Sequence, residues 1–161
     1  MCPSNKDKVA YDEKLELEKR SLLEIISREK AFSRRQPLLV EGYTETLSRE
    51  SYFVTPFFGS LPESVDSNNL ALKVDREKPQ AYFVEQPSQA TVPAHYHDTN
   101  QFQIFLKGGL IFGKQQIKPL SVHYAGGHTP YGPITTTYEG AHYLTLRNKW
   151  DAGGKKMSEF R

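Results

Sequence analysis

From Tyr52 onwards, apolar and polar residues alternate in short runs, which is the pattern of β-strands with one buried face. Gly, Pro and Asn residues separate the runs, and these residues interrupt strands and favour turns. Many short strands with frequent interruptions are typical of an all-β barrel or sandwich. The runs with strand character are Tyr52–Phe58, Leu70–Val74, Ala81–Val84, Ala90–His97, Gln101–Leu106, Leu110–Phe112, Ile117–Tyr124 and Ala141–Arg147.

The N-terminal part has a helical period instead. Over Asp12–Ala31, apolar residues recur among charged residues of good helix propensity, and Leu15, Leu22 and Ile26 share one helix face. We predict an amphipathic helix that ends before Pro37, because a residue before proline avoids the helical region. Its apolar face requires a cover. Mixed charges favour the barrel or a partner subunit over a membrane surface.

The length of 161 residues fits one domain with an appendage. We assign residues 1–36 to a polar arm and helix, 37–150 to the barrel, and 151–161 to a basic, solvated tail. Lys and Arg exceed Asp and Glu by 21 − 19 = 2, so the chain lacks the basic footprint of nucleic-acid binding. No apolar run approaches the roughly 20 residues of a membrane helix. With no apolar signal core and a single cysteine, Cys2, we expect a cytoplasmic protein.

Two histidines one residue apart carry the strongest chemical signal. His95 and His97 share one face of a strand, because alternate strand residues point the same way. Asp98–Asn100 predicts a turn, and Gln101 and Gln103 follow on the next strand. A hairpin of this register brings two imidazoles and two amides into one pocket.

The spacing around these histidines resembles the first motif of the cupin superfamily, Gly-x5-His-x-His-x3-4-Glu-x6-Gly. His95, His97 and Gly108 match the motif, whereas Gln89 stands at the leading glycine and Gln101 at the glutamate. The resemblance implies an RmlC-like barrel, that is, a double-stranded β-helix or jelly roll. It implies fold more specifically than reaction, because one such scaffold hosts many chemistries.

The same resemblance, which covers Tyr52–Arg147, favours a homodimer. If the amides of the glutamine strand line the interior, then Phe102, Ile104 and Leu106 face outward. Three large apolar side chains in a row require a cover. The N-terminal helix, the Tyr52–Phe58 strand or a second subunit are the candidates.

The cupin ligand set implies a divalent metal, such as Fe, Mn, Ni or Zn, held by His95 and His97, with Gln101 in place of the carboxylate. A third histidine comes from a later motif, Pro-x-Gly-x-x-His. Here Pro130–Thr135 has the proline and the glycine but places threonine at the ligand position. Another histidine must then supply the nitrogen, and three-histidine sites occur among cupin-like dioxygenases. We rank the candidates in the order His128, His142 and His123. The alternative is that His95 and His97 bind a ligand or water without metal.

Two functions therefore stay open. With a metal, the resemblance implies oxygen-dependent oxidation of a small organic molecule at a non-haem iron-like centre, or isomerase or lyase chemistry. Without one, the barrel binds a small molecule without catalysis. A third interpretation makes the chain an assembly partner of a larger enzyme.

The sequence contains no nucleophile elbow and no phosphate-binding loop. A tyrosine can serve as an acid or pack with a solvated hydroxyl, and the candidates are Tyr124, Tyr131, Tyr138 and Tyr143. Of these we assign Tyr131 as catalytic. The residues assigned to substrate contact are Gln103, Phe105, Thr135 and His142.

Overall fold

The structure, a computed structural model, describes residues 24–38, 45–46, 52–61 and 76–157. Most of the predicted helix Asp12–Ala31 and all of the predicted strand Leu70–Val74 lie outside these residues. None of the described segments forms a helix long and apolar enough to cross a membrane. The described elements are α2 (Arg28–Phe32), β1 (Gln36–Leu38), β2 (Glu45–Thr46), β3 (Tyr52–Phe58), β4 (Gln80–Gln86), β5 (Ala90–Val92), β6 (His95–Tyr96), β7 (Gln101–Phe112), β8 (Gln115–Ile117), β9 (Val122–Ala125), β10 (Ile134–Arg147) and β11 (Lys155–Lys156).

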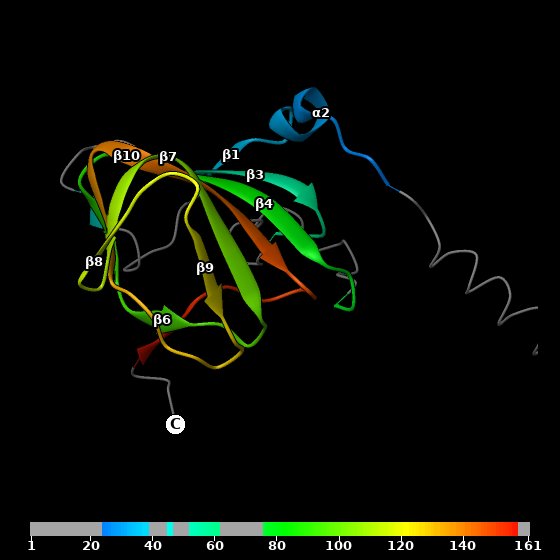
Figure 1. The fold of residues 1–161 in the computed structure, drawn as a ribbon. Helices are drawn as coiled ribbons and strands as arrows, with labels where there is room; N and C mark the ends of the chain where they lie inside the picture. Colours follow the sequence, from blue (N-terminus) through cyan, green and yellow to red (C-terminus); the bar gives the residue numbers. More distant parts are fainter. Residues whose placement is uncertain (1–23, 39–44, 47–51, 62–75, 158–161) are drawn as a thin grey trace, which may run out of the picture.

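The strands form a jelly roll in which the long strands β7 and β10 run through both layers (Figure 1). Among the described residues, nine strands share one continuous sheet in the order β1-β3-β4-β10-β5-β2, with β7 beside β10, and β8 and β9 beside β7. The first part of β10 pairs with β5 and the end of β7, whereas its second part pairs with β4 and the start of β7. One sheet is thus folded over on itself, which confirms the predicted all-β jelly-roll class.

Both long strands bend at a glycine. Gly108 of β7 has φ +78° and Gly140 of β10 has φ +66°, and the register between the strands shifts between Thr136 and Ala141. A left-handed φ at a bulge suits glycine because glycine lacks a Cβ. Gln89, at the leading glycine of the cupin motif, also has a positive φ of 52°. Both glycine positions of the motif are therefore places where this backbone turns.

Alternate residues of the central strands point into the barrel and divide it into an apolar and a polar end. At the apolar end, Phe105 and Tyr143 pack with ring centroids 5.4 Å apart inside a cluster of buried side chains. At the other end of the same strands, Gln101, Gln103 and Arg147 are also buried. Burial of amides and a guanidinium is costly unless they are hydrogen-bonded, so this end is the candidate functional region.

Several predicted strands differ from the observed ones at proline and turn residues. The strand Tyr52–Phe58 is confirmed with the same bounds. The predicted run Ala90–His97 is interrupted at Pro93, which has no N–H for the ladder. The run Ile117–Tyr124 is interrupted as well, because Leu120 has φ 67° in the turn between β8 and β9.

The predicted hairpin between the histidine strand and the glutamine strand is wrong. β6 pairs with β11, while β7 pairs with β8, β9 and β10. The turn at Asp98–Asn100 redirects the chain, and the Asn100 side chain accepts a hydrogen bond from the Gly127 N–H at 2.8 Å. Figure 1 shows β6 below the main sheet, at the end of the barrel. Lys155–Lys156, assigned to the tail, form β11 on this strand.

The short helix α2 lies on the outer face of the sheet. It begins at Arg28 because the Ser27 hydroxyl accepts a backbone N–H of the first turn and caps the helix. The prediction that the helix runs through Glu24–Ser27 is therefore wrong. Phe32 contacts Phe83 of β4, with ring centroids 5.9 Å apart, and this contact packs the helix onto the barrel.

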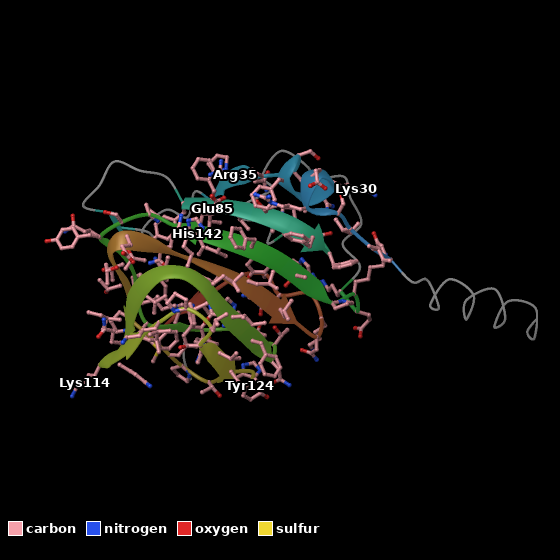
Figure 2. The ribbon with its side chains drawn as sticks, turned by 45° about the horizontal axis from the view of Figure 1, so that its top comes forward. Lys30, Arg35, Glu85, Lys114, Tyr124 and His142 are labelled. Carbon is pink, nitrogen blue, oxygen red and sulfur yellow. The ribbon has the colours of Figure 1, made fainter. Side chains whose placement is uncertain are left out.

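Beside α2, the outer face carries a charged contact. Arg35 donates a hydrogen bond of 2.6 Å to Glu85, and its guanidinium lies 3.5 Å from the centre of the Phe53 ring. His142 packs edge-on against Phe83, with ring centroids 5.6 Å apart. Figure 2 shows Arg35, Glu85 and His142 together on this face. His142 therefore lies outside the barrel, on the opposite face of β10 from the interior.

The outer face of β7 and β9 is apolar and exposed. Phe102 and Leu106 are 48% and 45% exposed, as the alternation predicts, whereas Ile104 is half-buried. Tyr124 of β9 packs on Phe102, with ring centroids 4.9 Å apart, and Figure 2 shows it at the outside of the molecule. The homodimer that such a surface favours stays a prediction.

Candidate functional site

The polar end of the barrel holds one connected set of side chains, called the polar network below. Its members come from β4, β6, β7, β9 and β10 and from the loops after β6, β9 and β10. His95 and His97 both point inward, at 4% and 7% exposure, with ring centroids 5.2 Å apart. The full set is Gln80, His95, His97, Gln101, Gln103, His123, Tyr131, Arg147 and Asp151.

Three imidazoles of the network are held in the same way. The Nδ1 atoms of His95, His97 and His123 lie 2.8, 2.8 and 2.9 Å from the Pro93 carbonyl, an Asp151 carboxylate oxygen and the Gln103 amide oxygen, respectively. Each partner is an acceptor, so each Nδ1 carries the hydrogen and donates it. The three Nε2 atoms therefore carry the lone pairs.

The three Nε2 atoms have different surroundings. The Tyr131 hydroxyl lies 2.9 Å from Nε2 of His95 and donates to it, and the same hydroxyl oxygen accepts a hydrogen bond from the Gln101 amide. Nη2 of Arg147 lies 3.1 Å from both Nδ1 and Nε2 of His97, over the face of the ring. Nε2 of His123 has no hydrogen bond to any described residue. This ring is half-buried and lies 5.0 Å, centroid to centroid, from the Tyr131 ring.

Arg147 and Asp151 form the charged centre of the network. The guanidinium donates to the Gln101 amide oxygen at 3.1 Å, to the Gln80 amide oxygen at 3.3 Å and to Asp151 at 3.2 Å. Asp151 also accepts the Asp98 backbone N–H at 3.0 Å. Both charged residues are at most 5% exposed. A buried pair of this kind persists only when its remaining polar atoms are satisfied, as they are here.

Burial sets the protonation states of the network. It lowers the pKa of His95 to about 4, with a further contribution from His97. It also lowers the pKa of His97, together with the Arg147 charge, and that of His123. Burial raises the pKa of Asp151, but the His97 hydrogen bond and the Arg147 charge outweigh it and bring the pKa to about 2. At neutral pH the imidazoles are therefore neutral and the carboxylate is charged.

We expect the free energy of unfolding to fall as the pH drops from 6.5 to 4. An unfolded histidine titrates near pH 6.5, whereas His95 in the folded chain titrates near 4. Within this window the unfolded chain binds the additional proton, so the contribution of His95 is complete above 6.5 and is lost towards 4. For His95 alone the loss amounts to about 3 kcal/mol. Urea unfolding at several pH values measures it.

A histidine on the surface provides the control for this pH dependence. The His128 side chain is 68% exposed and lies outside the polar network, so His128→Gln is the comparison variant. His95→Gln should flatten the slope of stability against pH more than His128→Gln does. If both variants keep the slope of the unmodified chain, His95 is not a buried neutral imidazole.

The structure brings together some of the predicted site residues and separates others. Its network contains His95, His97, Gln101, Gln103 and Tyr131. The remaining predicted residues lie elsewhere: His128 is exposed beside Asp98, Phe105 is in the apolar core, Thr135 is hydrogen-bonded to Thr91 on the other face of β10 from Ile134 and Thr136, and His142 is on the outer face.

Gln80, Arg147 and Asp151 are not among the residues predicted from the sequence, and His123 is the last of the three candidate histidines. The sequence does contain a signal for His123. Pro119 and His123 have nearly the spacing of the proline and histidine in the later cupin motif, Pro-x-Gly-x-x-His, and they follow Gly108 by one hairpin. Arg147 also carries a signal, because it shares the alternation of Tyr143 and Thr145 and so falls on the inner face. Nothing in the local pattern marks Asp151, which follows the last strand.

No protein-family model matches this chain, and no curated protein matches it either. Among solved structures, it is similar to a candidate acetylacetone dioxygenase from Methylibium petroleiphilum PM1, with a TM-score of 0.58 at 9% identity over 85% of this chain and 83% of that one. An acetylacetone dioxygenase from Acinetobacter johnsonii gives 0.52 at 12% identity, over 86% and 87%. An RmlC-like cupin protein from Ralstonia eutropha JMP134 gives 0.51 at 9% identity, over 81% and 72%. The chain has a cupin fold.

At such identities the likeness establishes the fold, and the chemistry must be argued from the site residues. One feature of the site suits a divalent metal. Histidines that bind metals donate the N–H of their other ring nitrogen to a fixed acceptor, and His95, His97 and His123 all donate in this way.

The other contacts of these imidazoles do not fit a resident metal. Tyr131 bonds Nε2 of His95, and the Arg147 guanidinium lies against Nε2 of His97. Two unit charges 4 Å apart interact by about 4 kcal/mol at an effective dielectric constant near 20, and a divalent ion doubles this repulsion from the guanidinium. Within the described part of the chain, no three His, Cys, Asp or Glu side chains are placed to share an ion. The predicted ligand set of His95, His97, Gln101 and His128 is not assembled either.

Proposed function

We propose that this cupin binds a small carbonyl compound at the polar end of its barrel and moves a proton on it, with Tyr131 as the acid. One observation carries the proposal: the Tyr131 hydroxyl lies between Nε2 of His95 and the amide of Gln101. The Tyr131 ring is half-buried and stacks on Phe112, with centroids 5.5 Å apart. The hydroxyl is thus held by the network on a side chain that still reaches solvent.

His123 is the base that this geometry supports. Its Nε2 carries a lone pair that no described residue engages, and its Nδ1–H is fixed on Gln103. Burial lowers the pKa of His123, so the ring is neutral at physiological pH and able to accept a proton. Phe112 packs against this ring, with centroids 4.3 Å apart, and offers an apolar surface for the body of a ligand.

The proposed step is an enolisation. Nε2 of His123 takes a hydrogen from the carbon next to the carbonyl, and the electron pair of that C–H bond forms the carbon–carbon double bond. The carbonyl oxygen replaces Nε2 of His95 as the acceptor of the Tyr131 hydroxyl and gains its proton. The Gln101 amide N–H, which already donates to the Tyr131 oxygen, stabilises the tyrosinate that is left. Reversal of the step returns a hydrogen to the carbon, so no other reactant is consumed.

We expect Tyr131→Phe to lower the rate of proton exchange on a carbonyl probe by about 10²- to 10⁴-fold, the contribution usual for a positioned acid or base. The probe is 2-pentanone in D₂O with a metal chelator, and proton NMR follows the loss of the hydrogens next to the carbonyl. Removal of the hydroxyl deletes the acid but keeps the ring that stacks on Phe112.

Tyr124→Phe is the matched control, since Tyr124 is 54% exposed on the outer face, and it should exchange like the unmodified chain. Equal exchange by the Tyr131 and Tyr124 variants would contradict the proposal. If the unmodified chain binds the probe by calorimetry without exchange, the barrel is a non-catalytic binding protein.

The second candidate is a metal-dependent dioxygenase. It is favoured by the three anchored imidazoles and by the fold likeness to proteins named as acetylacetone dioxygenases. It requires Arg147 to leave His97. Oxygen consumption by iron-loaded protein with thiols, diketones and aromatic diols tests it, and turnover lost in a His95→Ala, His97→Ala variant would establish it over the metal-free proposal.

A further inference from the structure

We propose that Arg147 excludes divalent metals from the cluster of His95, His97 and His123, so that the positive charge at this end of the barrel is a fixed guanidinium. The inference deepens the proposed function and rests on its metal-free chemistry. It assigns Arg147 a role in specificity: the guanidinium supplies the charge that opposes a metal ion at these imidazoles, beside the neutral Tyr131 hydroxyl on Nε2 of His95.

The guanidinium is held in place from several elements. Gln101 of β7 accepts from its Nε, while Gln80 of β4 and Asp151 accept from Nη1. Arg147 itself is 5% exposed. A planar guanidinium whose donors are fixed in this way has a defined position and a low tendency to swing away.

Its remaining nitrogen lies against the ring of His97. Nη2 of Arg147 is 3.1 Å from both Nδ1 and Nε2 of that ring, so the guanidinium lies over the imidazole face. Nδ1 of His97 donates to Asp151, which leaves Nε2 as the nitrogen that could bind a metal. A cation bound there would stand directly beside the guanidinium charge.

Without Arg147 the remaining obstacle is the neutral Tyr131 hydroxyl on Nε2 of His95, which a metal ion can displace without charge repulsion. The imidazoles must also turn towards one another, because in the unmodified chain no three of the described His, Cys, Asp or Glu side chains are placed to share an ion. Neutral imidazoles suit borderline divalent ions such as Co²⁺, Ni²⁺ and Zn²⁺. The three rings already carry lone pairs on Nε2, each with Nδ1 fixed on an acceptor. The rings of His95, His97 and His123 surround Tyr131, with centroids 4.4, 6.1 and 5.0 Å from it.

The test is the affinity of the full chain, without a histidine tag, for Co²⁺, followed by the visible absorption of the bound ion. We expect the unmodified chain to show no bound-cobalt spectrum. The double variant Arg147→Met, Asp151→Asn should bind one equivalent about a hundredfold more tightly, the upper end of the effect that groups behind the ligands have on metal affinity. The asparagine keeps an acceptor for Nδ1 of His97 and removes the carboxylate that would otherwise be unpaired.

Two further proteins complete the design. Arg35→Met removes an arginine that also pairs with a carboxylate, on the outer face, and should not bind cobalt. Addition of His95→Ala and His97→Ala to the double variant should abolish binding. If the double variant does not melt cooperatively, Arg147→Gln, which keeps a neutral donor, replaces it. Cobalt bound equally by the unmodified chain, or by no folded Arg147 variant, would overturn the proposal.

Deuterium exchange on 2-pentanone, measured in chelator on the same proteins, keeps the two proposals separate. Cobalt binding by the unmodified chain, with exchange intact, would remove the role of Arg147 alone. Metal exclusion without exchange would remove the proton-transfer function alone.

Discussion

Replacement of Asp151 by alanine should lower the free energy of unfolding by roughly 3–5 kcal/mol, the cost of removing one partner of a buried ion pair. Asp151 is 3% exposed and accepts from Arg147, His97 and two backbone N–H groups. Its removal leaves a guanidinium in the interior without a counter-charge. Since small domains are stable by only about 5–15 kcal/mol, urea unfolding with linear extrapolation will resolve the change easily.

Asp98→Ala is the control within the same contact region. Asp98 bonds Lys155 at 2.5 Å, but its side chain is 41% exposed, and exposed ion pairs contribute at most about 1 kcal/mol. The Asp151 variant should therefore be destabilised several times more than the Asp98 variant. A difference within error would show that Asp151 is not the centre of a buried network.

The second large effect is expected at the bend of the long strands. Gly108→Ala should destabilise the fold by about 3 kcal/mol or more, because alanine is strained at a left-handed φ and must also clash with its surroundings. Gly108 has φ +78°, and a Cβ there would overlap the carbonyl oxygen of Gly140 on the paired strand. Thermal unfolding of the variant measures the cost.

Gly113→Ala separates the two causes. Gly113 also has a positive φ, of 61°, but a Cβ there meets only the Gly132 oxygen, at 3.6 Å. Gly113→Ala should therefore lower the free energy of unfolding only by the backbone strain, about 1–2 kcal/mol. Equal losses at Gly108 and Gly113 would mean that the strands do not cross closely at the bend.

The fold was predictable because alternation and spacing are local properties. Side chains of a strand alternate between its two faces. This alternation predicts the strand Tyr52–Phe58, and it predicts that Gln101 and Gln103 both point into the barrel. The cupin resemblance added the closure of the sheet. Pairing partners were not predictable in the same way: the turn at Asp98–Asn100 was recognised, but not that it directs β6 towards β11.

The site was predictable only where its residues lie close together in the sequence. His95, His97 and Gln101 form one motif, but Gln80 and Asp151 reach the same network from 71 positions apart. Arg147 ends the predicted strand Ala141–Arg147, but its charge alone does not reveal that it has a buried partner. Alternate residues of β10 point into the barrel, which places Arg147 inside, and Asp151 pairs with it there.

The inward imidazoles are organised around Tyr131 and the Arg147 guanidinium, and we infer that they hold no metal ion. Crystals of the full chain grown with excess zinc, with an anomalous difference map at the zinc edge, examine this inference at the site itself. We expect no peak among His95, His97 and His123, and density for Nη2 of Arg147 against the His97 ring. An anomalous peak bonded to Nε2 of two or more of these histidines, with Arg147 turned away, would contradict it.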